Sequence, residues 1–188
     1  MRRRLFVAAD LDDEARTACA RVAERLRAKG WPGRWVAPEN YHLTVAFLGA
    51  VDDERVADVT AAVRDGAAHA ARFDVSLDSV GAFPNARKPR VAWVGPTAEV
   101  AMFRALCAAV RRPLAALGFT FESPADAHVT LARSDGRVPL PSVEAPRIAP
   151  QRVAGLALYE SFTERTGARY VVRERFPLAG ERITGPRR

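Results

Sequence analysis

A sequence repeat constrains this chain more than any other feature. The tripeptides His42-Leu43-Thr44 and His128-Val129-Thr130 lie 86 positions apart, and at the same offset residues 5–29 fall on residues 91–115. Each half therefore predicts the same order, which is a strand, a helix, a short strand and then a strand that begins with His-x-Thr. This pattern predicts two lobes related by a pseudo-two-fold axis that brings the two equivalent strands to one cleft.

The periodicity of the apolar residues predicts the individual elements. Short apolar or alternating runs indicate strands, and apolar positions that recur every three or four residues indicate helices. The predicted strands are 5–9, 34–36, 42–48, 73–83, 90–95, 128–133, 153–162 and 168–178, and 119–122 is expected to be extended like 34–36. The predicted helices begin at Asp12 or Asp13, at Asp52 or Asp53, and at Thr97 or Glu99, and they end near 29, 70 and 117. Residues 134–150, rich in proline and polar side chains, are expected to form a loop.

The composition is that of a globular protein. The chain has 188 residues, of which 48% are hydrophobic and 27% are charged. Its longest apolar runs are far shorter than the ~18 residues that suggest a membrane span. Arg2–Arg4 and the apolar residues after them resemble the start of a signal peptide, but Asp10 and Asp12 interrupt the apolar region too early. A cytoplasmic location without membrane association is therefore expected.

The chain is strongly basic. It carries 29 Lys and Arg against 22 Asp and Glu, which gives a net charge of +7 and a pI near 10.4. All of the basic residues except Lys29 and Lys88 are arginines. This excess is compatible with a phosphate-rich partner, because neutralising phosphates releases counterions. Arginine-rich composition can equally reflect genomic bias, so charge alone leaves a nucleic-acid partner open.

Several common chemistries lack the residues that they require. Cys19 and Cys107 fall in predicted helices, where small buried apolar side chains are expected rather than a metal site or a disulfide. The sequence has no His-x-His, no His-x-x-x-His and no close cysteine pair. Neither a Walker-type glycine-rich loop nor a serine-hydrolase elbow is present. We therefore expect no metal or other cofactor.

The two His-x-Thr tripeptides supply the residues of a phosphate site. Because side chains at i and i+2 of a strand project from one face, His42 shares a face with Thr44, and His128 with Thr130. Hydroxyl groups donate hydrogen bonds to phosphate oxygens, and an imidazole titrates near neutral pH, so it can act as a general base or a general acid. Two facing histidines can serve the opposite sides of an in-line displacement at phosphorus.

Four other residues are candidates for a functional role. His69 lies near the end of a predicted helix without a counterpart in the repeat, and it is interpreted as structural or merely exposed. Strict strand alternation places Phe47 on the face opposite His42, which predicts a core residue. Trp35 and Tyr41 have rings that could stack on a base, but packing is the favoured interpretation of both.

At these motifs the sequence resembles a known family. Arg34–Gly49 is similar to the first signature of the 2H phosphoesterase superfamily, and Ala127–Arg133 is similar to its second. The resemblance is greatest to bacterial and archaeal RNA 2′,3′-cyclic phosphodiesterases, also called 2′-5′ RNA ligases of the LigT type, and it extends from Leu5 to about Pro177. It implies a bilobal α+β fold, with an antiparallel sheet and outer helices in each lobe around a central cleft. Residues 1–188 are expected to form one such domain.

The resemblance also implies a role for each motif residue. His42 would be the general acid that protonates the leaving ribose oxygen, and His128 would be the general base that takes a proton from water. Thr44 and Thr130 would hold the non-bridging oxygens of the phosphate. Arg133, directly after the second motif, would add charge stabilisation, with an ordinary surface arginine as the alternative.

The implied function is the conversion of an RNA terminal 2′,3′-cyclic phosphate to a 2′-phosphomonoester without a metal ion. The expected substrates are RNA ends or nucleoside 2′,3′-cyclic phosphates, and a monomer with no obligatory protein partner is expected. Two alternatives stay open at this point. The same site supports 2′-5′ RNA ligation if a 5′-hydroxyl replaces water, and a nucleotide- or RNA-binding module without turnover is the non-enzymatic alternative.

Overall fold

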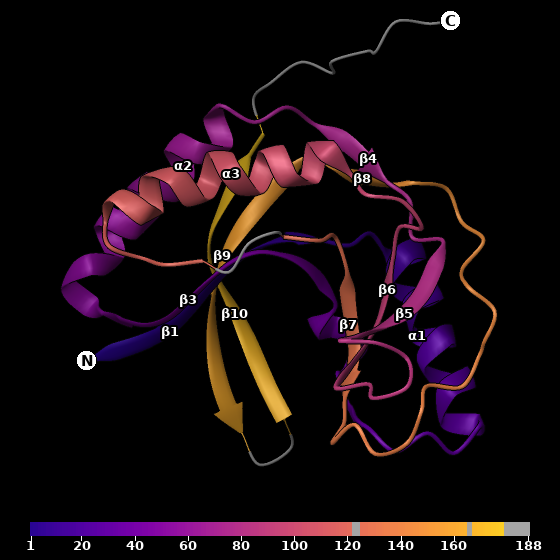
Figure 1. The fold of residues 1–188 in the computed structure, drawn as a ribbon. Helices are drawn as coiled ribbons and strands as arrows, with labels where there is room; N and C mark the ends of the chain where they lie inside the picture. Colours follow the sequence, from indigo (N-terminus) through magenta and orange to yellow (C-terminus); the bar gives the residue numbers. More distant parts are fainter. Residues whose placement is uncertain (122–124, 165–166, 179–188) are drawn as a thin grey trace, which may run out of the picture.

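The computed structural model describes residues 1–121, 125–164 and 167–178 of the chain, and Figure 1 shows their arrangement. The α-helices of these residues are α1 (Asp13–Ala28), α2 (Val56–Ala68) and α3 (Ala101–Ala116). The strands are β1 (Arg2–Asp10), β2 (Arg34–Trp35), β3 (His42–Asp52), β4 (Phe73–Val75), β5 (Ser79–Phe83), β6 (Val91–Gly95), β7 (Val129–Arg133), β8 (Gln151–Val153), β9 (Gly155–Glu164) and β10 (Gly167–Pro177). Short 3-10 turns at Pro38–Asn40 and Asp53–Arg55 complete the regular structure.

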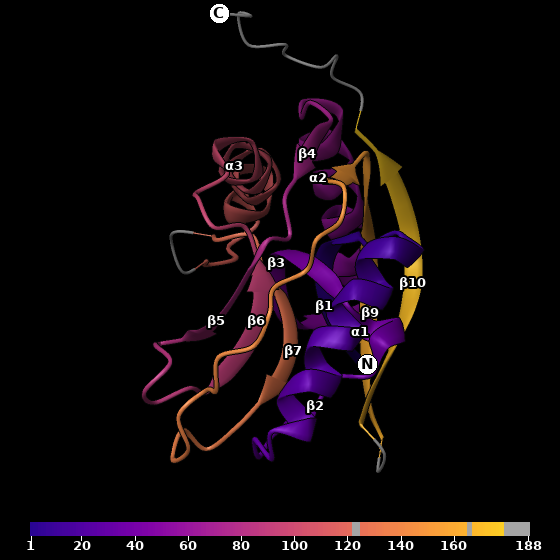
Figure 2. The same ribbon diagram turned by 90° about the vertical axis from the view of Figure 1, so that its right-hand side faces the viewer.

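An antiparallel sheet forms the centre of the molecule. Its strand order is β10-β9-β1-β3-β7-β6-β5, and β2 pairs with β7 beside this path. Strands β4 and β8 form a separate two-stranded sheet. Every strand pair is antiparallel, and the helices lie outside the sheet (Figures 1 and 2). This architecture confirms the predicted α+β class.

The sequence repeat is visible in the fold. Under the 86-residue offset, β1, α1 and β3 of the first half correspond to β6, α3 and β7 of the second. Strands β3 and β7 are neighbours in the middle of the sheet, where Leu43 faces Val129. Helix α1 packs against β7 and helix α3 against β3, so each half covers the central strand of the other. The pseudo-two-fold axis therefore passes between the strands that carry the His-x-Thr motifs.

Local sequence explains the helix ends and one close helix contact. The Asp12 side chain caps α1 by accepting a hydrogen bond from the Ala15 N–H at 2.8 Å, and Gly30, with φ of +72°, ends the helix in a left-handed conformation. Helices α2 and α3 pack side by side (Figure 1). A Cβ at Gly66 of α2 would lie 2.6 Å from the Val110 Cα of α3. This position therefore requires glycine because the two backbones meet there.

Long-range pairing changes two predicted strands. The expected continuous strand 73–83 is divided into β4 and β5, because β4 pairs with β8 while β5 pairs with β6. The expected strand 153–162 likewise begins two residues later as β9, and β8 was not predicted as a strand of its own. Strands β4 and β8 pair with each other but lie far apart in sequence, so the local alternation of apolar residues does not indicate their pairing. Residues 134–150 contain no helix or strand, as predicted.

Several element boundaries also differ from the prediction. Strand β1 begins at Arg2 rather than at residue 5, and α2 begins at Val56, after the 3-10 turn, rather than at Asp52 or Asp53. Strand β3 continues past Gly49 to Asp52, because β1 pairs with it along its whole length. Helix α3 begins at Ala101 rather than at Thr97 or Glu99. The backbone N–H and the hydroxyl of Thr97 both donate to the Asp78 carboxylate, at 2.7 and 3.0 Å, and this anchors the residues before the helix in a turn.

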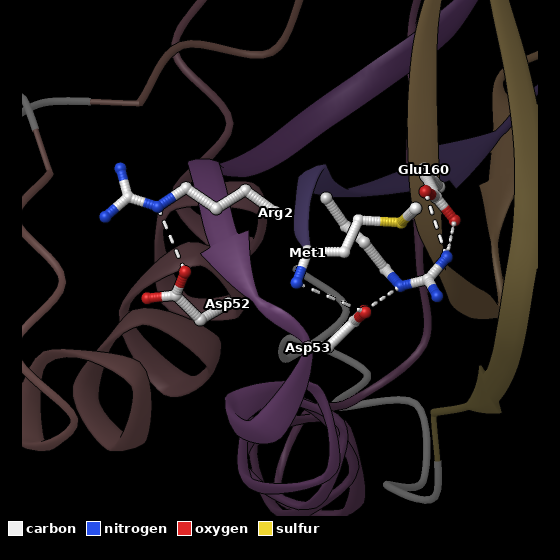
Figure 3. Close-up of polar contacts among 6 residues, drawn as sticks. Met1, Arg2, Asp52, Asp53 and Glu160 are labelled. Carbon is white, nitrogen blue, oxygen red and sulfur yellow. Dashed lines mark hydrogen bonds and ion pairs between the residues drawn. The ribbon is translucent and has the colours of Figure 1, made fainter.

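Ion pairs bind the N-terminal strand to its neighbours (Figure 3). The Arg3 guanidinium bonds the buried Glu160 carboxylate of β9 at 3.1 and 3.2 Å, and it also pairs with Asp53 beyond the end of β3. Arg2 pairs with Asp52 at 3.0 Å. Part of the basic excess thus serves the fold rather than a ligand.

Both cysteines are free and buried, as predicted from their helical positions. Burial raises the pKa of the Cys19 and Cys107 thiols to about 12, so neither is a reactive thiolate at neutral pH. Within the described ranges, no helix is both long and apolar enough to cross a membrane.

Candidate active site

The two motif histidines lie beside each other at the centre of the sheet. Leu43 and Val129 are buried opposite partners of β3 and β7, whereas His42 and His128 are only partly buried. Side chains alternate along a strand, so both imidazoles project from the face opposite these two apolar residues. The structure therefore brings the predicted acid and the predicted base to one face.

The two threonines complete a symmetric group on this face. Extending the antiparallel register by one residue from the Leu43–Val129 pair places His42 opposite Thr130 and Thr44 opposite His128. Diagonal positions of paired antiparallel strands lie about 7–8 Å apart. This spacing suits two imidazoles that act on opposite sides of one phosphate, with the two hydroxyls between them.

The same backbone contact orients each imidazole. His42 Nδ1 lies 2.7 Å from the Asn40 carbonyl oxygen, and His128 Nδ1 lies 2.8 Å from the Asp126 carbonyl oxygen. A carbonyl only accepts hydrogen bonds, so Nδ1 carries the proton and donates it in both residues. Nε2 is then the nitrogen left for substrate. It accepts a proton in the neutral imidazole and donates one in the imidazolium.

Aromatic rings surround the two histidines unequally. The His42 ring centroid lies 4.9 Å from that of Phe6, 5.6 Å from that of Tyr170 and 6.4 Å from that of Tyr159. These rings come from β1, β9 and β10. His128 instead meets Phe83 of β5, edge to face, at 5.0 Å. The long C-terminal hairpin β9–β10 thus covers the His42 side of the pair only.

Burial sets the protonation state of the pair. Burial lowers the pKa of His42 to about 4. The hydrogen bond to the Asn40 carbonyl acts in the opposite direction and raises this pKa, whereas the charge of His128 lowers it further. Burial also lowers the pKa of His128, opposed by the carbonyl and the charge of Asp126, while the positive charge of Arg133 lowers it further. Both imidazoles are therefore neutral at pH 7 in the free site. Unfolding restores an ordinary pKa, so acid weakens the fold as pH falls from 6.5 toward 4.

We predict that an anion binds this site together with a proton. Negative charge beside His42 favours its imidazolium and raises its pKa. Sulfate keeps the same charge between pH 5 and 7, so a pH dependence of its binding comes from the protein. Because binding takes up a proton, the Kd for sulfate should fall by up to about tenfold for each pH unit from 7 toward 5. Isothermal titration in buffers of different ionisation enthalpy measures the proton uptake.

The matched variants for this test are His42→Asn and His69→Asn. The first should abolish most of the pH dependence, and the second should keep it, because His69 is exposed at the end of α2 and bonds the Asp65 carbonyl there. A sulfate affinity independent of pH in the unmodified protein would contradict the proposed linkage.

A β-bulge in β3 alters which residues reach the site. Thr44 and Ala46 face consecutive residues of β1, so Val45 is an extra residue between them. The bulge moves the alternation by one position, and Phe47 is 63% exposed with its ring 6.1 Å from that of Phe6. The prediction that Phe47 is a core residue was wrong. It lies on the face of His42 because strict alternation does not hold across a bulge.

Strand β7 has the same irregularity at the equivalent place. Thr130 and Ala132 face consecutive residues of β6, so Leu131 is the extra residue, and Arg133 is exposed. The charge of Arg133 acts on His128 and also on Tyr170 across the sheet. Arg133 occupies the repeat position of Phe47, and this equivalence was the one sequence signal that could have identified Phe47 as a site residue.

The remaining aromatic candidates have structural surroundings. Tyr41 is buried in the core, and Trp35 packs edge to face on Trp31 at 5.8 Å with the Arg27 guanidinium 4.7 Å from its ring centroid. The packing interpretation is confirmed for both. Among the described residues, no group of three or more His, Cys, Asp or Glu side chains is arranged to hold a metal ion.

Comparison with known proteins agrees with this geometry. Residues 9–93 match the family described as LigT like phosphoesterase. An RNA 2′,3′-cyclic phosphodiesterase of Archaeoglobus fulgidus is 37% identical over 131 residues, which cover 69% of this chain and 72% of that protein. One of Thermus thermophilus is 33% identical over 190 residues, which cover 95% and 91% of the two chains.

Solved structures give the same result. The E. coli LigT complexed with 3′-AMP superposes with a TM-score of 0.79 at 31% identity, over 96% of this chain and all of that one. A protein of Thermus thermophilus superposes with a TM-score of 0.80 at 32% identity, over 96% and 99%. With its repeat, its paired histidines and these similarities, the chain belongs to the LigT-like phosphoesterase family.

Proposed function

We propose that residues 1–188 act as one 2H phosphoesterase domain that hydrolyses an RNA terminal 2′,3′-cyclic phosphate to a 2′-phosphomonoester. The observation that carries this proposal is the symmetric pair of His42 and His128, each held by a backbone carbonyl at Nδ1 with Nε2 left for substrate. The relatives named RNA 2′,3′-cyclic phosphodiesterases support the same substrate class. The protein acts as a cytoplasmic monomer, without a metal or other cofactor.

The two histidines take opposite roles in the reaction. His128 Nε2 accepts a proton from water, whose oxygen attacks phosphorus in line with the ribose O3′. The new P–O bond forms as the P–O3′ bond breaks, and His42 Nε2–H protonates O3′. The products are a 2′-phosphomonoester and a free 3′-hydroxyl. General acid and base catalysis of this kind requires one neutral and one charged imidazole in the same complex.

The substrate itself supplies the protonation state that this division needs. Both imidazoles are neutral in the free site because burial lowers their pKa values. The anionic phosphate favours the imidazolium of His42, while the charge of Arg133 beside His128 keeps that imidazole neutral. Thr44 and Thr130 donate hydrogen bonds to the non-bridging oxygens, and Arg133 balances the charge that grows on them.

Product analysis tests the proposal. An oligoribonucleotide that ends in a 2′,3′-cyclic phosphate is incubated with the protein in EDTA and without ATP. The expected product is the 2′-phosphomonoester alone. A 3′-phosphomonoester would show that O2′ leaves instead, and a requirement for ATP or metal would contradict the acid–base assignment. Absence of any turnover would favour the alternative of a binding module.

The hairpin between β5 and β6 is expected to contact the RNA backbone. Arg87 and Lys88 are exposed at its tip, on the half of the sheet that carries His128. Each single-strand phosphate contact contributes about 0.7 to the slope of log K against log salt. Replacing both residues by alanine should therefore reduce the slope by about 1.4 if each contacts a phosphate.

The control for this prediction removes the same charge elsewhere. Arg21 of α1 and Arg112 of α3 lie on helices that cover the other face of the sheet. Their double alanine variant should leave the salt slope for a short cyclic-phosphate oligonucleotide near that of the unmodified protein. Equal slopes in all three proteins would identify the hairpin tip as a solvated turn.

A further inference from the structure

A row of polar side chains crosses three neighbouring strands of the sheet. Tyr170 of β10 faces Ser161 of β9, and Glu160 of β9 faces Leu5 of β1. The next position of this antiparallel register places Arg4 of β1 opposite Ser161. We call Arg4, Ser161 and Tyr170 the Tyr170 row. Because neighbouring strands lie about 4.8 Å apart, the row is about 10 Å long.

The Tyr170 row lies on the face of the sheet that carries the motif histidines. The Tyr170 ring centroid lies 5.6 Å from that of His42 and 4.8 Å from that of Phe6. Side chains at i and i+2 of a strand point the same way, so Arg4 shares the face of Phe6. The row therefore begins beside His42 and leads away from it across β9 to β1.

Every member of the Tyr170 row can donate a hydrogen bond to an anion. Ser161 shares its face with Tyr159, whose ring stacks on that of Phe6 at 5.0 Å, so the serine hydroxyl also points to the site face. Burial raises the pKa of Tyr170, so its hydroxyl keeps its proton at neutral pH. Arg4 is exposed, and a guanidinium is always charged in this range.

A second arginine reaches the row from the other half of the sheet. Burial raises the pKa of Tyr170, whereas the charges of Arg133 on β7 and of Arg4 lower it. Both guanidiniums are therefore near enough to act on the tyrosine hydroxyl. Among the residues that the structure describes, neither arginine forms an ion pair, in contrast to Arg2 and Arg3 of β1 (Figure 3).

The carboxylates nearest to the row are held by other arginines. Glu160 of β9 points to the opposite face, where Arg3 bonds it at 3.1 Å and Arg173 lies 3.5 Å from it. Asp10, at the far end of β1, is held by Arg175. The positive charge along the Tyr170 row is thus left for a ligand, and it favours an anion.

The side of the histidine pair on which the row lies indicates which anion it binds. Tyr170 packs against His42, the acid of the proposed reaction, whereas His128 meets Phe83 of β5. The ribose beside His42 is the leaving one, and its 5′ carbon carries the next phosphate of an RNA chain. We propose that the Tyr170 row and Arg133 bind this internucleotide phosphate. The assignment rests on the proposed function, because it uses the roles given there to the two histidines.

A cavity of about 230 Å³ beside His42 is less suited to this phosphate. Its lining includes Asp10 and Glu39, whose carboxylates repel an anion. Both arginines of the lining already bond protein groups, since Arg175 holds Asp10 and Arg16 bonds three backbone carbonyls. We therefore expect the RNA chain to pass over β9 and β1 rather than into this cavity.

The consequence is a preference for RNA ends over nucleoside 2′,3′-cyclic phosphates. A nucleoside 2′,3′-cyclic phosphate carries only the phosphate that reacts, whereas a dinucleotide carries one more for the Tyr170 row. The β5–β6 hairpin lies on the other half of the sheet and is left to phosphates farther along a longer RNA.

The test compares kcat/KM for adenosine 2′,3′-cyclic phosphate, its 5′-phosphorylated form and ApA that ends in a 2′,3′-cyclic phosphate. Arg4→Gln should lower kcat/KM for the last two about 5- to 10-fold, as expected for one lost charge-assisted contact, and leave the first unchanged. Arg4→Lys keeps the charge and should lose less. Tyr170→Phe keeps the ring beside His42 but removes the hydroxyl, so it should lower the ratio of ApA to adenosine substrate about 3- to 10-fold.

The matched control is Arg21→Gln, because Arg21 is exposed on α1 and should affect none of the three substrates. An equal loss on all three in Arg4→Gln would mean that Arg4 serves the fold alone, and it would overturn the assignment, as would no loss on any. A loss on ApA without one on the 5′-phosphorylated nucleotide would also overturn it, because the second nucleoside would then make the contact.

Equilibrium binding keeps this result distinct from the proposed function. By isothermal titration, adenosine 2′,5′-bisphosphate should bind more tightly than adenosine 2′-monophosphate, and Arg4→Gln should remove most of the difference. A protein that shows this preference without hydrolysing cyclic phosphates would contradict the proposed function but not the phosphate-binding row. A protein that hydrolyses cyclic phosphates without any such preference would overturn the row alone.

Discussion

Replacing either motif histidine by alanine should nearly abolish the hydrolysis of cyclic phosphates. General acid or base catalysis contributes typically ~10² to 10⁴ in rate, so His42→Ala and His128→Ala should each lower kcat by that factor. Both side chains are partly exposed on the site face, while Leu43 and Val129 between them carry the packing. The melting temperature should therefore change little. Single-turnover kinetics on a nucleoside 2′,3′-cyclic phosphate measures the loss.

The double variant distinguishes a concerted pair from two independent contributions. Residues that act as one unit have strongly non-additive effects, so the double alanine variant should be hardly slower than either single one. His69→Ala is the matched control, because that histidine is exposed outside the site and should leave kcat unchanged. Substantial activity in both single variants would refute the acid–base assignment.

Removing a threonine hydroxyl from the site should have the second largest effect. A hydrogen bond to a charged group contributes about 1.5–3 kcal/mol, which corresponds to a loss in kcat/KM of about 10- to 150-fold for Thr44→Val or Thr130→Val. Valine keeps the branched shape of threonine and its preference for strands, so the backbone should be retained. Because the two positions are related by the pseudo-two-fold axis, the two losses should be similar.

A threonine elsewhere in the sheet provides the control. Thr163 of β9 is exposed, and Thr163→Val should leave kcat/KM unchanged. Full activity of both Thr44→Val and Thr130→Val would show that the hydroxyls do not hold the phosphate. A rise in KM without a change in kcat would place their contribution in substrate binding alone, because such an interaction is equal in the ground state and the transition state.

Local patterns were sufficient for the order of the main elements and for the meeting of the two His-x-Thr motifs. The repeat at 86 residues predicted that β3 and β7 are equivalent and that their His-x-Thr motifs meet. The period of the apolar residues predicted the position of helix α1, because that period depends only on which face of an element is buried. The same patterns predicted the burial of both cysteines. Chemistry that depends on residue type and on position along one strand is readable from the sequence.

The surroundings of the pair were decided by the tertiary structure. The bulges at Val45 and Leu131 depend on how β1 and β6 pair with β3 and β7, and they alone bring Phe47 and Arg133 to the site face. The low pKa of His42 arises from its burial, and the rings around it come from β1, β9 and β10.

The pairing of β4 with β8 and the cavity that Phe83, Trp93 and Arg104 form beside His128 likewise join residues far apart in the chain. The alternation of side chains along one strand specifies which residues share a face. It carries no information about where a bulge adds a residue or about which distant segment covers a given side chain. The sequence by itself determined the two His-x-Thr motifs and their symmetry. The packing of the two halves decided their protonation state and the shape of the space around them, because both depend on contacts that no local pattern records.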